Sequence, residues 1–318
     1  MKEKKDLNIV FMGTPEFAVT ILEKLIKESY NIKAVVSAPD RPAGRGRKLQ
    51  GSAVKDCALR NDLPILQPTN LKDDEFINEL NSFDPDLFIV VAFRMLPKVV
   101  WKIPKMGTFN LHGSILPQYR GAAPINWAII NGETETGVTT FYIDKKIDTG
   151  QTLMSRSLSI GENETAGALH DRMMVLGAEV VFETVELIRL GNAQPKPQIE
   201  GDLKPAPKIS KQDCFIDLTQ PIRRIHNFIR GMSPYPTAWI KLRNKETNEE
   251  KTLKLFHSEI LNELEHSSNT LKKENKDLIL NTNTGTIKLN EIQLEGKRRL
   301  DNVSFLAGFN VNEWEIIS

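Results

Sequence analysis

The sequence has few of the residues and motifs that would assign it to a particular class of protein. Its 318 residues include only two cysteines, Cys57 and Cys214, which lie far apart and lack the spacing of a metal site. This cysteine content argues against a disulfide framework and is typical of a reducing compartment. Neither sign of charge dominates, because 42 basic and 41 acidic residues give a net charge of +1. That balance excludes a highly basic nucleic-acid scaffold or an acidic tail, but it leaves room for a local basic patch.

A long hydrophobic run is missing from the start of the chain. The first residues, "MKEKKDLNIVFMG", are charged and then apolar over only a few positions. Such a stretch is too short for the core of a signal peptide or for a membrane span, and it is typical of a first strand. We therefore expect a cytoplasmic protein with no membrane segment.

Several catalytic and cofactor motifs are also absent. The sequence has no G-x-S-x-G, H-E-x-x-H or C-x-x-C, and Gly13 stands alone where a G-x-G-x-x-G motif needs three glycines. A serine hydrolase, a metal centre and a dinucleotide site are therefore not supported, and we expect no metal. If the chain is an enzyme, its substrate has to bring the nucleophile.

What the first 190 residues do contain is an alternation of apolar runs with amphipathic segments. The apolar runs are nearly continuous, as in strands buried on both faces, and span residues 7–12, 32–37, 87–93 and 108–111. Helix-like segments span residues 15–28, 52–60, 73–81 and 165–190. This alternation predicts βαβ units and an α/β fold with a mostly parallel, Rossmann-like sheet.

From residue 191 onward, the chain differs from the first part in composition and in its predicted elements. Residues 191–209 hold four prolines and few apolar residues, which is typical of an extended, semi-rigid linker. A helix is expected at residues 217–232, a polar loop at 262–277, and β-type runs at 237–242, 252–260, 277–281 and 286–289. Short strands in this number predict a small barrel or sandwich, with an OB-type barrel as a candidate. We expect a catalytic domain at 1–190, a linker at 191–209 and a second domain at 210–318.

An unusual set of polar residues follows one predicted strand, in "FNLHGSILPQYRGAAP". Asn110 and His112 are two residues apart, so in an extended chain both side chains point to the same side. They would lie at the carboxyl end of a parallel strand, where open α/β sheets bind ligands. An amide beside an imidazole can polarise a carbonyl and hold the oxyanion that forms on attack. A carboxylate to orient the imidazole is available from Asp148 in "YIDKKIDTGQ", or less favourably from Asp144.

A structural role for the same residues is the alternative. A histidine after a strand is more often structural than catalytic, and Asp148-Thr149-Gly150 can be a simple turn. Spacing alone does not decide between the two.

A resemblance to a known family favours catalysis. The stretch "NLHGSILPQYRGAAPINWAIINGETETGVT", followed by "IDTG", resembles the formyltransferase superfamily that uses 10-formyltetrahydrofolate. Its hallmark residues match Asn110, His112, Asp148 and the segment formed by Ser114, Ile115, Leu116 and Pro117. The loop "PDRPAGRGRKL", the segment "IRGMSPYPTAW" and "FMGTPEFA" near the start are similar to the superfamily branch that acts on methionyl-tRNA.

This resemblance implies an activity and a donor site. The implied reaction transfers the formyl group of 10-formyltetrahydrofolate to the α-amine of methionine on initiator methionyl-tRNA, which supports translation initiation. Asn110 and His112 would hold the oxyanion, and Asp148 would orient His112 and help to take the proton of the amine. The folate would contact Ser114, Ile115, Leu116 and Pro117, together with Phe93, Arg94, Met95 and Leu96. The sequence "VVAFRMLP" departs from the family at Phe93 and Arg94, where Tyr-Gly and one further residue are common.

The resemblance also implies contacts to tRNA. The loop would supply Arg41, Arg45, Arg47 and Lys48, and the second domain would supply Lys208, Arg223 and Arg230. Among the loop arginines we rank Arg45 first. The balanced charge and self-contained domains lead us to expect a monomer.

Other functions are compatible with some of the same residues or with the same fold. An aminosugar formyltransferase would use the same donor and the same three catalytic residues, but it has no need for the arginine-glycine loop. A formyltetrahydrofolate hydrolase would use water as the acceptor, and a glycinamide ribonucleotide formyltransferase fits poorly because it lacks the second domain. A non-catalytic RNA-binding protein on the same scaffold is the alternative from another class.

Overall fold

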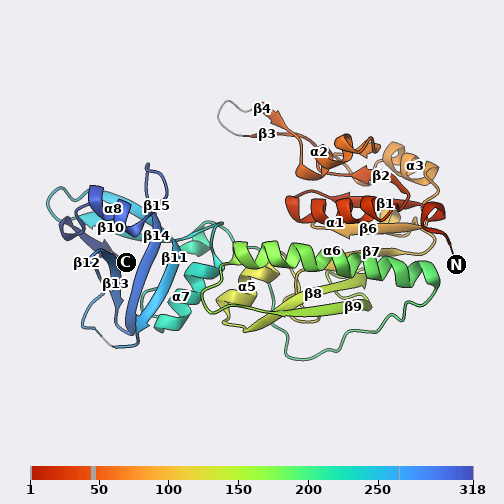
Figure 1. Ribbon diagram of the computed structural model, residues 1–318. Helices are drawn as coiled ribbons and strands as arrows, with labels where there is room; N and C mark the ends of the chain where they lie inside the picture. Colours follow the sequence, from red (N-terminus) through yellow and green to blue (C-terminus); the bar gives the residue numbers. More distant parts are fainter. Residues whose placement is uncertain (1, 44–47, 265, 318) are drawn as a thin grey trace. The chain divides into compact units, whose positions relative to one another are not determined.

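The computed structural model describes residues 2–43, 48–264 and 266–317. The chain forms two compact units, drawn in Figure 1. The first unit comprises Met1–Gly121, Gly137–Leu158 and His170–Pro205, and the second comprises Ala122–Thr136, Ser159–Leu169 and Ala206–Ser318.

The first unit is built on a mostly parallel sheet with the strand order β5-β2-β1-β6-β7-β8-β9. The first five strands in this order, β5, β2, β1, β6 and β7, are parallel to their neighbours, and β8 runs antiparallel to β7. The order reverses between β1 and β6, as in Rossmann-like folds, so the predicted α/β class is confirmed. The strands are β1 (Ile9–Gly13), β2 (Ile32–Val36), β5 (Ile65–Leu66), β6 (Leu87–Val91), β7 (Thr108–His112), β8 (Glu135–Tyr142) and β9 (Thr152–Ser159).

Helices cover both faces of this sheet because its strands are apolar on both sides. On one face, Phe76 and Leu80 of α3 (Asp74–Ser82) and Val100 of α4 (Lys98–Trp101) join a buried cluster with Val10 and Phe88. The other face carries α1 (Glu16–Lys27), with α2 (Ala53–Arg60) beside it, and the long helix α6 (Ala166–Leu190).

The packing of α6 is close. A Cβ added to Gly177 of α6 would lie 2.8 Å from the Leu111 side chain of β7, and the rings of Phe17 and His170 are 5.2 Å apart. Leu111 therefore faces α6, which leaves its neighbours Asn110 and His112 on the opposite face of β7.

The second unit is an antiparallel, nearly closed barrel in the order β12-β13-β14-β11-β10-β16, with β15 paired to β14. The end strands β12 and β16 are in contact, which gives the predicted OB-like form. The strands are β10 (Ala238–Asn244), β11 (Glu250–Asn262), β12 (Thr270–Glu274), β13 (Asp277–Thr282), β14 (Gly285–Leu294), β15 (Leu300–Asp301) and β16 (Trp314–Ile317). The helices are α5 (Pro124–Ile130), α7 (Ile222–Gly231) and α8 (Asn302–Gly308).

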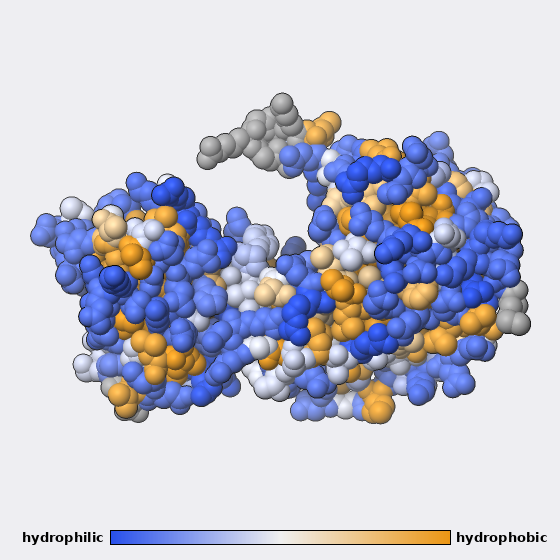
Figure 2. All heavy atoms as spheres, viewed as in Figure 1, coloured by the Kyte–Doolittle hydropathy of each residue, from blue (hydrophilic) through white to orange (hydrophobic). Residues whose placement is uncertain are grey.

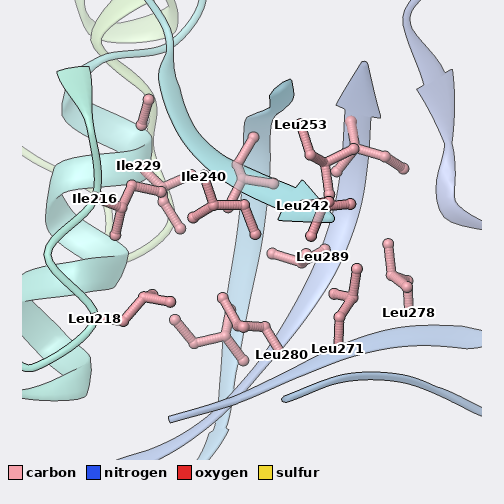
Figure 3. Packing of buried hydrophobic residues seen from close by; sticks show 14 of the residues in the cluster. Ile216, Leu218, Ile229, Ile240, Leu242, Leu253, Leu271, Leu278, Leu280 and Leu289 are labelled. Carbon is pink, nitrogen blue, oxygen red and sulfur yellow. The ribbon is translucent and has the colours of Figure 1, made fainter. Parts of the chain in front are cut away.

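Figure 3 shows the core of this barrel, in which Ile229 of α7 lies beside Ile240 and belongs to the same buried cluster as Leu253 and Leu280 from the strands. Two differences from the sequence predictions concern this unit. The helix expected at 217–232 begins only at Ile222, after Pro221. The segment expected as a polar loop contains β12, whose single buried apolar side chain, Leu271, is too weak a periodic signal to indicate a strand.

The remaining elements are short. Strands β3 (Arg41–Ala43) and β4 (Lys48–Gln50) form an antiparallel ribbon, and 3-10 turns span Lys4–Asp6, Gln212–Cys214 and Val311–Glu313. The visible surface of each unit is mostly hydrophilic, with small separate apolar patches (Figure 2). Among the described residues, no helix combines the length and apolarity that crossing a bilayer demands.

Candidate functional site

Strand β7 presents two polar side chains at its carboxyl end. Asn110 lies opposite Val90 of β6 and Phe141 of β8, and His112 lies opposite Thr139. The two residues share one face of the sheet, and His112 is 6% exposed. Within the described part of the chain, the half-buried Asn110 amide has no hydrogen-bond partner. This amide is free to donate to a ligand.

The imidazole of His112 is held from both sides. Its Nε2 is 2.7 Å from the carbonyl oxygen of Tyr119, and a carbonyl only accepts, so Nε2 carries the hydrogen. Its Nδ1 lies 3.7 Å from Oδ2 of Asp148, which is ion-pair distance but too long for a hydrogen bond. In the neutral ring Nδ1 therefore carries the lone pair, and only the protonated ring can donate from Nδ1.

Asp148 sits on a tight loop after β8. Its backbone is left-handed, with φ of +54°, and a Cβ added to Gly150 would lie 1.6 Å from the carbonyl oxygen of Tyr142. Oδ2 of Asp148 accepts a hydrogen bond of 2.9 Å from the backbone N–H of Gly121. The other carboxylate considered from sequence, Asp144, is exposed and accepts from the Lys146 N–H in a turn.

The segment after His112 is tied by hydrogen bonds of its own. Thr139 Oγ1 donates to the Ser114 carbonyl at 2.7 Å, and the Ser114 hydroxyl donates to the Gln118 carbonyl at 2.6 Å. Ser114 is fully buried, so its hydroxyl serves the loop and a ligand would meet the neighbouring residues instead. These neighbours are buried or half-buried: Ile115, Leu116 and Pro117.

The four residues predicted near the folate after β6 differ in accessibility. Leu96 is buried in the cluster beneath α3 and α4, with Phe93 packed against it, whereas Met95 is 72% exposed. The Arg94 guanidinium donates to the carbonyls of Pro68 and Thr69 and lies 5.6 Å from the Phe93 ring. Arg94 therefore ties this segment to the residues after β5.

The predicted basic loop has a defined base. Arg41 is exposed on β3, whereas Arg45, Arg47 and the side chain of Lys48 lie outside the described residues. Asp40, next to the ribbon, accepts hydrogen bonds from Gln67 at 2.7 Å and from Lys55 at 2.6 Å. These two partners hold the pKa of Asp40 below its usual value.

Of the three residues predicted for tRNA in the second unit, Arg230 is buried. It is 5% exposed, and its Nη1 donates to the carbonyls of Gly161 and Glu164 at 3.2 Å. Burial lowers its pKa. Its guanidinium thus satisfies internal acceptors in this structure, and its contact to tRNA stays a prediction. Arg223 and Lys208 are exposed, and Arg223 pairs with Glu263 at 2.9 Å.

The groups that hold the site were missed from sequence. The Tyr119 carbonyl and the Gly121 N–H are backbone atoms, which carry no signal in the residue type. Gln198 also reaches the site, because its side chain donates to the carbonyls of Asp148 at 2.9 Å and Gly150 at 2.8 Å. It belongs to the proline-rich segment (residues 191–209), for which the sequence predicts only a linker between two domains.

Comparison with known proteins identifies the class. Residues 7–185 match the Formyl transferase family, and residues 208–310 match the Formyl transferase C-terminal domain. The chain belongs to the formyl transferase family. Within it, a relative from Flavobacterium johnsoniae is 50% identical over 309 residues, covering 96% of this chain and 98% of its own. A relative from Bacteroides fragilis is 48% identical, covering 98% of each chain. Both are named methionyl-tRNA formyltransferase, so the resemblance predicted from sequence is confirmed.

Solved structures share the fold at low identity. The sugar 3N-formyl transferase WlaRD, determined with dTDP and 5-N-formyl-THF, has a TM-score of 0.67 at 22% identity and covers 92% of this chain and 99% of its own. HypX from Aquifex aeolicus, in complex with tetrahydrofolic acid, has a TM-score of 0.64 at 17% identity, covering 94% of this chain and 46% of its own.

Proposed function

We propose that this chain transfers the formyl group of 10-formyltetrahydrofolate to the α-amine of the methionine on initiator methionyl-tRNA. The observation that carries the proposal is the identity of about half of all residues, along nearly the whole chain, to relatives named methionyl-tRNA formyltransferase. The polar cluster at the end of β7 supports it, because the Asn110 amide, which has no partner within the described residues, lies on the same strand as the imidazole of His112, and the Asp148 carboxylate faces that imidazole.

In this reaction the neutral amine attacks the formyl carbon, and the former carbonyl oxygen becomes an oxyanion. The Asn110 amide is free to donate to that oxygen, which is the kind of contact that stabilises such intermediates by about 3 kcal/mol. It sits on a strand of the sheet, so it needs little reorganisation to act.

His112 would act through Nδ1, because the Tyr119 carbonyl occupies Nε2. Donation from Nδ1 requires the protonated ring, and the Asp148 carboxylate at 3.7 Å balances its positive charge. The protonated Nδ1 would steady the oxyanion and then give its proton to the departing folate nitrogen. Asp148 would take the proton that the attacking amine sheds, directly or through water, and restore it to His112. One proton thus leaves the amine and one reaches the folate.

The acceptor would be held by basic side chains. The predicted contacts to tRNA phosphates come from the basic loop, with Arg41, Arg45, Arg47 and Lys48, and from Lys208 and Arg223. The folate pocket would be shaped by two segments, which comprise Ser114, Ile115, Leu116 and Pro117 after β7 and Phe93, Met95 and Leu96 after β6. Arg94 would hold the second segment through its bonds to the carbonyls of Pro68 and Thr69. We propose that the protein acts as a cytoplasmic monomer, with a catalytic domain at 1–190, a linker at 191–209 and a tRNA-binding domain at 210–318; sedimentation of the purified chain tests the oligomeric state.

The decisive experiment offers three acceptors beside 10-formyltetrahydrofolate: methionyl initiator tRNA, methionyl elongator tRNA and a nucleotide-linked aminosugar. Selective formylation of the initiator tRNA is expected. Formylation of the sugar alone would keep the chemistry and overturn the acceptor. Bound folate without transfer to any acceptor would instead favour a non-catalytic RNA-binding protein.

A further inference from the structure

We infer that Gln198 of the proline-rich segment is a positioning residue for Asp148. This inference rests on the proposed function, since it concerns how the carboxylate is held beside His112. The Gln198 Nε2 uses both of its hydrogens on the Asp148 loop, one on the Asp148 carbonyl at 2.9 Å and one on the Gly150 carbonyl at 2.8 Å.

The loop needs such a brace because its backbone is strained. Asp148 holds a φ of +54°, which disfavours any residue with a Cβ, and such conformations persist only where the surroundings over-determine them. The Asp148 carboxylate itself has one backbone donor, the Gly121 N–H. Two further bonds to the carbonyls of the loop restrict the rotation that would carry the carboxylate away from His112.

The amide of Gln198 is itself held in one orientation. Its Oε1 accepts from Nε of Arg120 at 3.1 Å and from Nη2 of the same guanidinium at 2.6 Å. Since an arginine can only donate, this contact selects the oxygen and turns the nitrogen toward Asp148. The side chain of Gln198 therefore has a partner for each of its donors.

The same segment also grips the loop that holds the other side of the imidazole. The Tyr119 N–H donates to the Lys204 carbonyl at 2.7 Å, and Gln118 Oε1 accepts from the Lys204 N–H at 2.9 Å. The Tyr119 carbonyl is the acceptor of His112 Nε2. Residues 198–204 thus connect the loop that fixes His112 to the loop that fixes Asp148, and together they set the distance between Nδ1 and the carboxylate.

The test compares Gln198→Ala and Gln198→Glu with the parent in formyl transfer to methionyl initiator tRNA. Gln198→Glu keeps the side-chain size and the contact to Arg120 but loses both N–H donors, so it separates the brace from general folding. Both variants should lower kcat about tenfold, as expected for a modest misplacement of a catalytic group, with KM for either substrate changed less than about twofold. The pH profile of kcat should shift as well, because the pairing of Asp148 with His112 changes. Gln151→Ala is the matched control, since Gln151 is exposed beside the loop and its side chain has no partner within the described residues.

A second arm places Gln198→Ala in an Asp148→Asn background. If Gln198 acts through Asp148, adding Gln198→Ala to Asp148→Asn should lower kcat by less than about twofold, because the effects of the two substitutions are not additive. Parent-like kcat in both Gln198 variants, or a further tenfold loss beside Asp148→Asn, would overturn the inference. An Asp148→Asn variant with full activity would overturn the role of Asp148 and the inference with it, whereas a parent that transfers no formyl group to methionyl initiator tRNA would overturn the proposed function, so the two failures are distinguishable.

Discussion

Each unit of the molecule buries a histidine, and the two differ in what surrounds them. His112 in the first unit is 6% exposed and His226 in the second is 3% exposed. The ring of His226 is bonded to the Ser258 hydroxyl at 2.9 Å and to the Glu162 carbonyl at 3.3 Å, and burial lowers its pKa to about 4. His112 instead faces a carboxylate on one side and lies two residues from the Asn110 amide, for which the described part of the chain offers no hydrogen-bond partner.

The arginines follow the same division. In the second unit, Arg230 donates hydrogen bonds to internal carbonyls, whereas in the first unit Arg41 is exposed on the β3–β4 ribbon. A polar side chain whose partners all lie inside the protein has a structural role, however much its residue type suggests chemistry. The candidates for function are groups with a polar atom that has no neutral partner within the described residues, such as the Asn110 amide and Nδ1 of His112.

The strongest test of this comparison replaces each histidine by alanine. His112→Ala should lower kcat about 10³-fold, because it removes both a donor to the oxyanion and the proton for the leaving nitrogen. His226→Ala should leave kcat within about twofold at a temperature where the variant is folded. Initial rates of formyl transfer at saturating tRNA and folate measure both. Comparable rate losses in the two variants would erase the distinction between the sites.

A second test concerns Arg230. Replacement by methionine leaves the Gly161 and Glu164 carbonyls without their donor, which should lower the free energy of unfolding by about 3 kcal/mol. Arg223→Met is the matched control on the same helix, and its exposed ion pair with Glu263 should contribute little. Urea denaturation followed by tryptophan fluorescence compares the variants. Equal stability of the two would show that the burial of Arg230 is energetically unimportant.

The third test uses pH to separate the two regions. In an unfolded chain His226 binds a proton near pH 6.5, but in the fold its pKa is about 4. Between these values only the unfolded state is protonated, so the free energy of unfolding should fall as the pH is lowered, by up to about 3 kcal/mol. This loss should be absent above pH 7 and should shrink in His226→Gln. Urea denaturation at pH 7, 6 and 5 measures it, and an unchanged slope in His226→Gln would assign the effect to other groups.

The parts of the fold that sequence predicts are those with a strong periodic signal. Strands β1, β2, β6 and β7 are apolar runs buried on both faces, and they appear within a few residues of the predicted bounds. Strand β12 lacks that signal, because it lies at the end of the barrel sheet and turns only Leu271 into the core. Pairing with β13 decides its structure, and a partner strand cannot be seen in a local window.

The site divides in the same way. Asn110, His112 and Asp148 stand out in the sequence because their side-chain chemistry is unusual at the end of a strand. Their supports do not stand out, since the Tyr119 carbonyl could come from any residue, and Gln198 lies 50 residues from Asp148 in the chain. The burial of a side chain is equally hard to predict, since nothing in the sequence around Arg230 indicates that its guanidinium is buried.

The smallest predicted effect sharpens the comparison at the arginines of the predicted basic loop. Arg45→Ala, and to a lesser degree Arg41→Ala, should raise the KM for tRNA about tenfold and leave the KM for folate unchanged. Each lost phosphate contact should also reduce the slope of log affinity against log salt by about one. Arg60→Ala is the control, because Arg60 is exposed on α2 and pairs with Glu23 at 3.5 Å. Equal increases in both Michaelis constants, or the same loss in Arg60→Ala, would mean that the ribbon acts through general charge or stability. A loss confined to tRNA would instead show that the first unit carries both the reacting groups and a contact that selects the acceptor.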